Sequence, residues 1–324
     1  MNTSPVNQTL AVSKKTLRAK QWKSLRRRLK LSWELYLIIA LPVIWLLVFC
    51  YYPMYGVQIA FRKFVPRLGI LGSPWVGLDN FIKFFKSYNF ERVIINTLAI
   101  NIYDLIAGFP APIILALLLN NTLKTRFKKF VQIVTYMPYF ISTVVMVGII
   151  IQFLSPKVGI VNYFIKALGG PEIDFMGKPE YFRHIYVWSN IWQGTGWTAI
   201  IYLSALSSID PGLHEAALVD GANRFQRMWH IDIPGILPPI AIMLPLRMGN
   251  IMNIGFEKIF LMQNNLNIGT SEVMSTYIYK TGLAAAAPDY SYSAAIGFFN
   301  SVINFVLISI VNYINARINE VSLW

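Results

Sequence analysis

The chain has 324 residues, of which 55% are hydrophobic and 14% charged, and its mean hydropathy is +0.49. Soluble domains carry about 25% charged residues, so this composition excludes a disordered chain, a disulfide scaffold and an ordinary soluble enzyme, and predicts a membrane protein. The net charge of +14 is concentrated in residues 1–30, with nine basic and no acidic residues, and in 121–129, with four basic residues, which leaves +1 on the other 285 residues.

Basic clusters beside apolar runs are typical of the cytoplasmic segments of membrane proteins. Residues 1–30 form the first cluster, and we expect them to be a basic cytoplasmic segment preceding a membrane domain over 31–324. A nucleic-acid surface needs aromatic residues beside the basic ones, and this cluster offers only Trp22. We therefore expect a lipid bilayer as partner and no nucleic acid. The apolar run that follows is too long for a signal peptide.

Six segments are apolar and long enough to cross a bilayer, which takes about 20 residues. They are residues 35–61, 93–120, 130–154, 185–209, 233–256 and 290–316. Their length without alternation predicts helices, so the fold class is all-α, a polytopic membrane protein of about six transmembrane helices. The fifth segment is the least regular, because it contains four prolines and Arg247.

The distribution of lysine and arginine predicts the orientation of these spans. It places the N-terminus and the 121–129 loop in the cytoplasm, and an even number of spans returns the C-terminus there as well. The loops 62–92, 155–184 and 257–289 are then expected to face outward. In a bacterium, such a multi-pass protein would lie in the cytoplasmic (inner) membrane.

The sequence offers no catalytic residues and no metal ligands. His184, His214 and His230 lack the spacing of a metal site, and neither a nucleophile motif nor a phosphate-binding loop is present. We therefore expect a protein that is not an enzyme and that works with energy from an ion gradient or from another chain.

The most informative segment is the cytoplasmic loop 207–235 between the fourth and fifth spans. Asp210 and Pro211 are a helix start, and the helix is expected to run through Val219 and to end at Asp220-Gly221. A second short helix is expected over 223–229, before Pro234 breaks it. By itself this pattern also fits a helical hairpin packed under the bundle.

The spacing within this loop is specific. The pattern begins with Glu215-Ala216-Ala217, and Gly221 follows after three intervening residues. Nine residues separate Gly221 from Ile231, and one residue separates Ile231 from Ile233-Pro234. This order resembles the E-A-A-x3-G-x9-I-x-L-P loop of permease subunits of binding-protein-dependent ABC importers, with Ile233 in place of Leu. Further segments resemble the polysaccharide and complex-oligosaccharide permeases of that family, and they begin at Tyr136, Gly255 and Asn300.

The resemblance implies a type I ABC importer permease fold and a set of partners. These are a second permease subunit (a different chain), two ATP-binding subunits that hold ATP and magnesium, and an extracytoplasmic solute-binding protein. In the family, the loop is a coupling helix seated in a groove of the ATP-binding subunit. The resemblance assigns docking to Glu215, Ala216, Ala217 and Gly221, and Asp220 and Arg224 are expected as second contacts on physical grounds.

Polar residues inside the bilayer are costly and usually face the bundle interior or a wet cavity. At helical spacing, Arg247, Asn250, Asn253 and Glu257 share one face of the fifth segment. We expect the substrate pathway to include Arg247, Asn250, Asn253, Gln193, Trp192, Asn300 and Asn304. Amides can also join helices by hydrogen bonds, and tryptophans can anchor span ends. For Asp104 we expect an ion pair with a basic group of this or a partner subunit.

The function expected from the residues and the resemblance is ATP-driven import of a complex oligosaccharide. Arg247 favours an acidic, alginate-like oligosaccharide, since its planar fork suits a carboxylate, and neutral plant-wall oligosaccharides are the next choice. The alternative class is an ion-coupled secondary transporter of a small polar solute. That class normally shows repeated topology with paired broken helices, and the sequence shows no repeat.

Overall fold

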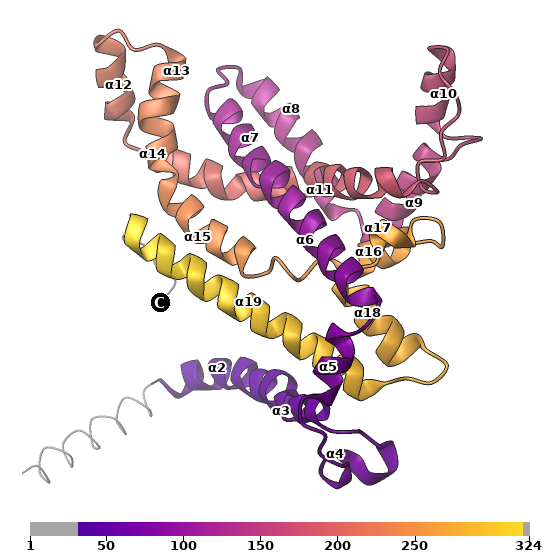
Figure 1. Cartoon of the computed structure of the whole chain (residues 1–324). Helices are drawn as coiled ribbons and strands as arrows, with labels where there is room; N and C mark the ends of the chain where they lie inside the picture. Colours follow the sequence, from indigo (N-terminus) through magenta and orange to yellow (C-terminus); the bar gives the residue numbers. More distant parts are fainter. Residues whose placement is uncertain (1–31, 320–324) are drawn as a thin grey trace, which may run out of the picture. The chain divides into compact units, whose positions relative to one another are not determined.

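The computed structural model describes residues 32–319, and this range folds into helices and turns with one isolated bridge, between Arg62 and Trp75, and no further β-structure (Figure 1). The all-α class predicted from composition is confirmed over the described range. The basic segment expected over 1–30 lies outside the described residues. The chain divides into two compact units between Gln58 and Ile59.

The described part of the first unit is one apolar helix. It comprises α2 (Trp33–Leu46), a π-helical turn (Leu47–Tyr51) and α3 (Tyr52–Met54), after which a 3-10 helix runs from Tyr55 to Phe61. Together they cover the first expected span. The sequence of α2 is apolar on every face apart from Glu34. A helix that is apolar all round needs lipid or another protein around it.

The second unit begins with two short helices and a long span. The short helices are α4 (Gly69–Gly72) and α5 (Asp79–Phe85), and the span consists of α6 (Asn89–Gly108) and α7 (Pro110–Asn120). Residues 89–120 form one apolar span, in which the regular helix is interrupted only at Phe109, and Pro110 begins α7 directly after it. The second expected span is therefore confirmed.

The third expected span is not a single helix. It consists of α8 (Thr125–Tyr136) and α9 (Thr143–Leu154), which are bent by 104°. Pro138 lies in the 3-10 turn that ends α8, and Ser142 is extended and starts α9 by accepting a hydrogen bond from the Val145 N–H. The apolar run hid this break, because proline in the turn and a serine N-cap interrupt a helix without lowering hydropathy much.

The helix α11 (Pro179–Ser207) follows α10 (Ile160–Ala167) and lies at the centre of the second unit. It packs against α6, α7 and α8. A Cβ added at Gly196 would lie 2.1 Å from the carbonyl oxygen of Thr135, so the α8 backbone approaches α11 closely there. α11 covers the fourth expected span, but among the described residues it is not one of the helices apolar enough to cross a membrane by length and composition.

The coupling loop leads into the fifth span through α12 (Pro211–Val219), α13 (Arg224–Arg227), a π-helical turn (Met228–Asp232) and α14 (Ile233–Gly235). Helix α15 (Leu237–Met248) follows after a bend of 59°. The expected break at Pro234 is wrong, because this proline lies in the first turn of α14 and the bend comes at Ile236.

The fifth span also ends earlier than expected. α15 stops at Met248, so the prediction that Arg247, Asn250, Asn253 and Glu257 share one helix face is wrong. The backbone N–H of Met252 donates instead to the Asn304 side-chain oxygen, at 3.0 Å. This side chain on another helix satisfies a donor that an unbroken helix would have paired internally.

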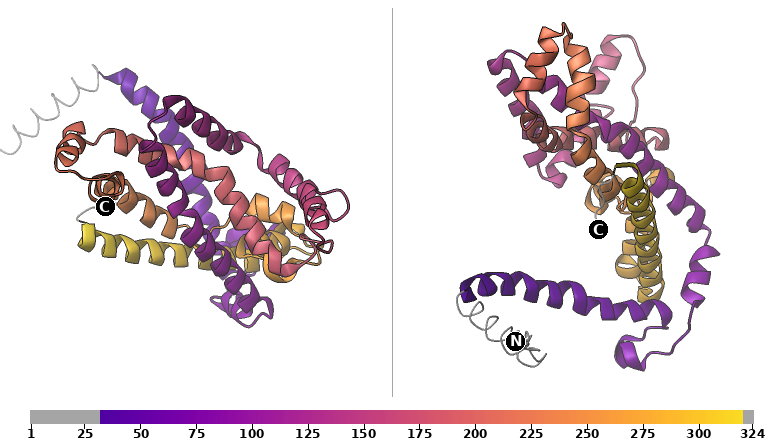
Figure 2. Two further views of the ribbon diagram at one scale, coloured as in Figure 1. Left: turned by 90° about the horizontal axis from the view of Figure 1, so that it is seen from above. Right: turned by 90° about the vertical axis from the view of Figure 1, so that its left-hand side faces the viewer.

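The C-terminal part comprises three short helices and the last span. The short helices are α16 (Phe256–Met262), α17 (Ile268–Ser271) and α18 (Met274–Tyr279), and the span is α19 (Tyr290–Asn319). α15 and α19 lie side by side in both ribbon views (Figure 2). Among residues 32–319, three uninterrupted helices and two bent pairs are long and apolar enough to cross a membrane.

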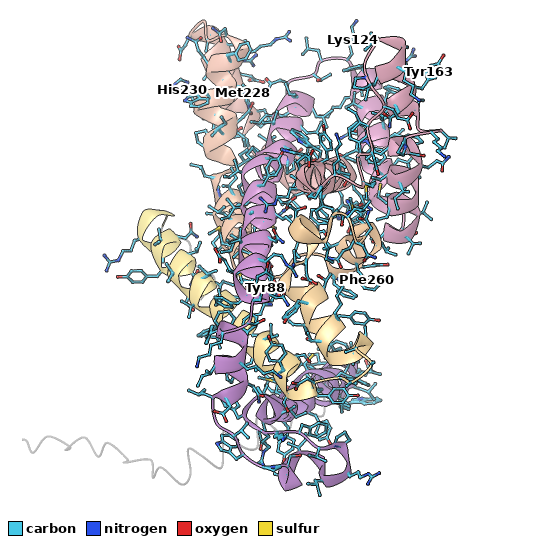
Figure 3. The ribbon with its side chains drawn as sticks, turned by 45° about the vertical axis from the view of Figure 1, so that its right-hand side comes forward. Tyr88, Lys124, Tyr163, Met228, His230 and Phe260 are labelled. Atoms are coloured by element: carbon cyan, nitrogen blue, oxygen red, sulfur yellow. The ribbon has the colours of Figure 1, made fainter. Side chains whose placement is uncertain are left out.

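Contacts within the second unit group the loops on two sides. Lys83 pairs with Asp289 at 2.7 Å, and Thr270 donates to the Pro179 carbonyl at 2.8 Å, so the three loops expected outside contact one another. On the other side, the turn between α7 and α8 contacts the 207–235 loop, because Asn121 in this turn donates to Asp232. Lys124, labelled in Figure 3, lies in the same turn.

Candidate functional site

The coupling segment forms a helical hairpin whose ends are set by local signals. The Asp210 carboxylate caps α12 by accepting from the Gly212 N–H at 2.9 Å. Gly221 has φ of 79°, a conformation that favours glycine, and the chain reverses there into α13. Asn223 and Gln226 form a reciprocal capping box at the start of α13. The predicted start at Asp210 and stop at Gly221 are confirmed.

The residues predicted to dock the ATPase all lie on this hairpin, but around two separate hollows. Glu215 and Arg224 line a hollow of about 440 Å³ together with residues of the α7–α8 turn. Ala217, Asp220 and Gly221 line another, of about 330 Å³, beside His230. Ala216 is exposed on α12. Glu215 is exposed and has no ion-pair partner within residues 32–319.

The hairpin also exposes large apolar side chains, which the sequence analysis did not select. They are Leu213, Leu218, Val219, Phe225 and Trp229, with exposed fractions from 53% to 89%. An apolar patch of this kind indicates a protein interface. The sequence could have predicted this exposure, because the two short helices carry more apolar residues than one buried face can hold.

Asp232 is a further residue that the sequence analysis missed. Its side chain is 1% exposed. It accepts from Asn120 at 3.3 Å and Asn121 at 3.1 Å, both at the end of α7, and lies 3.4 Å from His214 Nε2 on α12. The carboxylate thus ties the coupling helix to the second span. We call Asp232, Asn120, Asn121 and His214 the Asp232 junction.

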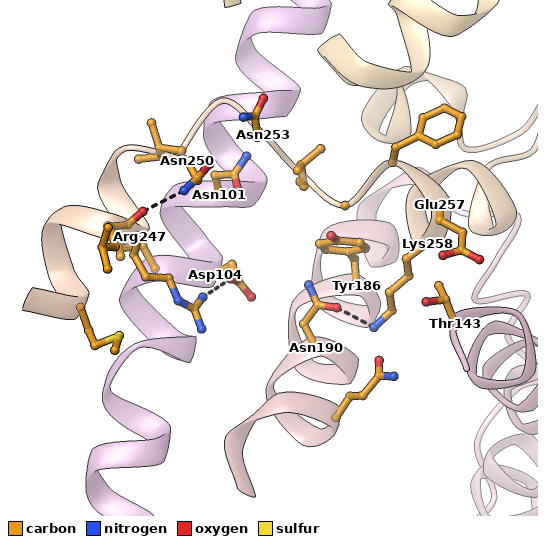
Figure 4. A pocket seen from close by; sticks show the side chains of 18 residues that line it. Asn101, Asp104, Thr143, Tyr186, Asn190, Arg247, Asn250, Asn253, Glu257 and Lys258 are labelled. Carbon is orange, nitrogen blue, oxygen red and sulfur yellow. Dashed lines mark hydrogen bonds and ion pairs between the residues drawn. The ribbon is translucent and has the colours of Figure 1, made fainter. Parts of the chain in front are cut away.

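A cavity of about 610 Å³, lined by charged and amide side chains among apolar ones, lies between α6, α9, α11, α15 and α16 (Figure 4). Arg247 on α15 reaches across it to Asp104 on α6, with Nη1 3.0 Å from Oδ2. The ion pair expected for Asp104 is therefore confirmed, with a partner 143 residues away in this same chain. The Arg247 side chain remains 42% exposed, so much of the guanidinium faces the cavity.

The predicted pathway residues divide into three groups. Arg247, Asn250, Asn253 and Gln193 line the cavity. Asn300 lies behind this wall and donates to Asn253 at 2.7 Å, and Asn304 is buried in the α15–α19 contact. Trp192 is 54% exposed and lies outside the lining.

Lys258 is the main cavity residue that the sequence analysis did not assign to the pathway. Its ammonium donates to Asn190 Oδ1 at 2.6 Å and lies 5.5 Å from the centre of the Tyr186 ring. Burial lowers the pKa of Lys258 to about 8, and the Asp104 carboxylate opposes this shift. The lysine was overlooked because it follows the expected end of the fifth span, whereas the early end of α15 brings α16 to the cavity wall.

The arrangement can bind a polar solute but shows no group positioned for bond-breaking chemistry. The lining of the cavity carries two cations, Arg247 and Lys258, two anions, Asp104 and Glu257, and several amides. Amides and charged groups set among apolar walls orient a ligand by hydrogen bonds.

Comparison with known proteins assigns the chain to a class. Residues 108–320 match the family described as "Binding-protein-dependent transport system inner membrane component". Protein LplB of Bacillus subtilis (strain 168) is 42% identical over 290 residues, which cover 90% of this chain and 91% of that protein. The polygalacturonan/rhamnogalacturonan transport system permease protein YteP of the same organism is 40% identical and covers 90% of each chain.

Two solved structures are similar over nearly the whole fold. A chain of a bacterial ABC transporter involved in the import of the acidic polysaccharide alginate has a TM-score of 0.84 and 40% identity, covering 91% of this chain and 99% of that one. A chain of a bacterial alginate ABC transporter in complex with an alginate pentasaccharide-bound periplasmic protein has the same TM-score and 39% identity, covering 92% and 99%.

The chain therefore belongs to the family of inner-membrane components of binding-protein-dependent transport systems. It is a permease subunit of an ABC importer and not an enzyme, since ATP hydrolysis in this class belongs to a separate subunit. The type I importer permease fold predicted from the resemblance is confirmed. The ion-coupled secondary transporter is not favoured, because the family and the structural match both point to ATP-driven import.

Proposed function

We propose that this permease subunit carries an acidic oligosaccharide through the cavity around Arg247. The observation that carries the proposal is a guanidinium 42% exposed beside a polar cavity of about 610 Å³. A guanidinium binds carboxylates through two parallel hydrogen bonds, and the cavity volume lies in the usual range of about 300–1,000 Å³ for small-molecule sites. The similar proteins named for polygalacturonan/rhamnogalacturonan and for alginate support the same substrate class.

A second cation strengthens the case for an acidic substrate. Lys258 faces the same cavity as Arg247. Two cations on different walls can hold carboxylates on successive uronate units, while Asn250 and Asn253 offer amides to sugar hydroxyls. A neutral oligosaccharide would bind to the amides and would form no ion pair with either cation.

The coupling hairpin is proposed to dock on an ATP-binding subunit. Its exposed apolar side chains supply the buried centre of such an interface, and the unpaired carboxylate of Glu215 is available to a cation of the partner. Ala216, Ala217 and Gly221 allow close approach of the two backbones, and Asp220 and Arg224 lie at the edge of the contact. Movement of the ATPase would pass through the Asp232 junction into α7.

The complete importer is proposed to contain this chain, a second and different permease, two ATP-binding subunits and an extracytoplasmic solute-binding protein. ATP and magnesium would bind to the ATP-binding subunits. The coupling side is proposed to face the cytoplasm, with both termini on that side, and the basic 121–129 loop supports this orientation. The structural neighbour that holds a sugar-loaded periplasmic protein supports this arrangement.

The substrate proposal is tested by uptake into proteoliposomes that hold the full complex, ATP and the binding protein. The two sugars compared are a uronate oligosaccharide and its carboxyl-reduced form, which has the same length and linkages. ATP-dependent uptake of the uronate form, reduced at least tenfold by Arg247→Gln, is expected. Arg317→Gln removes a cation outside the cavity lining and serves as the matched control. Equal uptake of both sugars, unchanged by Arg247→Gln, would point to a neutral substrate.

A further inference from the structure

The Asp104–Arg247 pair lies on the boundary between two cavities. Beside the 610 Å³ cavity, the described residues enclose a smaller one of about 200 Å³, and Asp104, Asn190 and Arg247 line both. The smaller cavity is lined by small and polar residues of α6, α7 and α11, among them Gly108 and Thr195. The Thr195 hydroxyl is buried and has no hydrogen-bond partner in the described part of the chain. The ion pair therefore forms part of the wall that the two cavities share.

The contact between the two side chains is incomplete. Arg247 donates through Nη1 alone to Asp104 Oδ2, at 3.0 Å, and this is the one hydrogen bond that its side chain makes within residues 32–319. A guanidinium has five N–H donors in a planar fork. The fork can therefore accept a carboxylate in a two-point contact that Asp104 does not make. Figure 4 shows Arg247 on α15 and Asp104 on α6 pointing toward each other, with Asn101 and Asn250 nearby.

Asp104 has another cation within electrostatic reach. Lys258 lines the same cavity as Asp104, and its ammonium is held by Asn190, which lines both cavities. If Arg247 turned to another anion, Asp104 would still face a positive charge. The exchange would not leave a carboxylate without a counter-ion, which is the step that makes breaking a partly buried ion pair costly.

We propose that Asp104 is an internal stand-in for the carboxylate of the substrate, and that an arriving uronate displaces it from Arg247 and opens the boundary between the two cavities. This inference rests on the acidic substrate of the proposed function. Asp104 is then a specificity-determining residue, because a neutral sugar has no group that can replace it on the guanidinium. In the described residues no other ion pair joins α6 to α15, so the exchange also removes the ion pair between these two helices.

The test is direct binding of sugar to the assembled permease–ATPase complex in nanodiscs, without the binding protein. The ligands are a fluorescently labelled uronate trisaccharide and its carboxyl-reduced form. Asp104→Asn removes the internal competitor and is expected to tighten binding of the uronate about three- to tenfold, which corresponds to losing one partly exposed ion pair. Binding of the reduced sugar is expected to stay unchanged.

The gain must depend on Arg247. In the Arg247→Gln background, Asp104→Asn is expected to give no gain, because the group for which the two anions compete is absent. A weaker or unchanged uronate affinity in Asp104→Asn, or an equal gain in the Arg247→Gln background, would overturn the proposal. Asp104→Ser is the second variant, expected to give the same gain, and thermal melting of each complex shows whether it is folded.

The two proposals fail in different ways. A wild-type complex that binds uronate and reduced sugar equally overturns the acidic substrate and this inference together. A wild-type complex that prefers the uronate, combined with no gain in Asp104→Asn, overturns this inference alone.

Discussion

Replacing Asp232 by asparagine is expected to uncouple ATP hydrolysis from transport. Asp232 is 1% exposed, and both of its carboxylate oxygens receive donors: Oδ1 faces Asn120 and His214, and Oδ2 faces Asn121. An asparagine keeps one acceptor oxygen and places an NH₂ group in the other position. In either orientation of the amide, its NH₂ group faces an N–H donor, either that of Asn121 or those on the side of Asn120 and His214.

The size of the effect follows from these contacts. A hydrogen bond to a charged group contributes about 1.5–3 kcal/mol. The shortest contact in the junction is 3.1 Å, and the substitution removes at least one bond and leaves one donor unsatisfied. Losing about 2 kcal/mol shifts the equilibrium between joined and separated arrangements about 30-fold. The connection between α12 and the end of α7 would then be open for much of the cycle.

The assay compares ATP hydrolysis and sugar uptake in the same proteoliposomes. Asp232→Asn is expected to keep complex assembly and substrate-stimulated hydrolysis, while sugar imported per ATP falls about tenfold. Asp210→Asn is the matched control, since asparagine caps a helix as well as aspartate does. If hydrolysis and uptake fall in parallel, or if neither changes, the junction does not transmit the motion of the coupling helix.

Two further predictions concern packing and pH. Gly196→Ala would place a Cβ 2.1 Å from the Thr135 carbonyl oxygen, so overpacking is expected to destabilise the complex by about 1–3 kcal/mol and lower its melting temperature. Gly194→Ala, whose Cβ meets nothing within 4 Å, should not lower it, and equal melting of the two variants would contradict the close approach. Because the pKa of Lys258 is lowered to about 8, affinity for a uronate should fall as pH rises through 8, where the ammonium loses its proton, and Lys258→Gln should remove this step. A step that persists in Lys258→Gln would assign the titration to another group.

Local signals made the coupling hairpin predictable from the sequence. Asp210 and Gly221 act through their own backbone and immediate neighbours, so the start and stop of α12 could be read from residue type and order. The positions of the spans were predictable for a related reason, since bilayer crossing requires long apolar helices. Both depend on information within about 30 consecutive residues.

Features that depend on contacts between distant segments could not be predicted. The break between α8 and α9 lies in an apolar run, and in the segment after α15 the backbone N–H of Met252 donates to Asn304 from α19. Asp104 was expected to pair with a cation, but only the fold brings Arg247 to it. Lys258 and Asp232 were missed because their burial and their partners come from other helices.

The central claim is that this chain is a permease and that a separate ATPase docks on α12. Affinity purification from the native membrane, followed by quantitative mass spectrometry, tests it most directly. Wild type is expected to recover an ATP-binding subunit and a second permease, together with ATPase activity. Glu215→Ala combined with Val219→Asp, an added charge in the apolar patch, is expected to keep the second permease and lose the ATP-binding subunit. A chain that purifies alone, or a variant that retains the ATP-binding subunit at the wild-type level, would contradict docking through this helix.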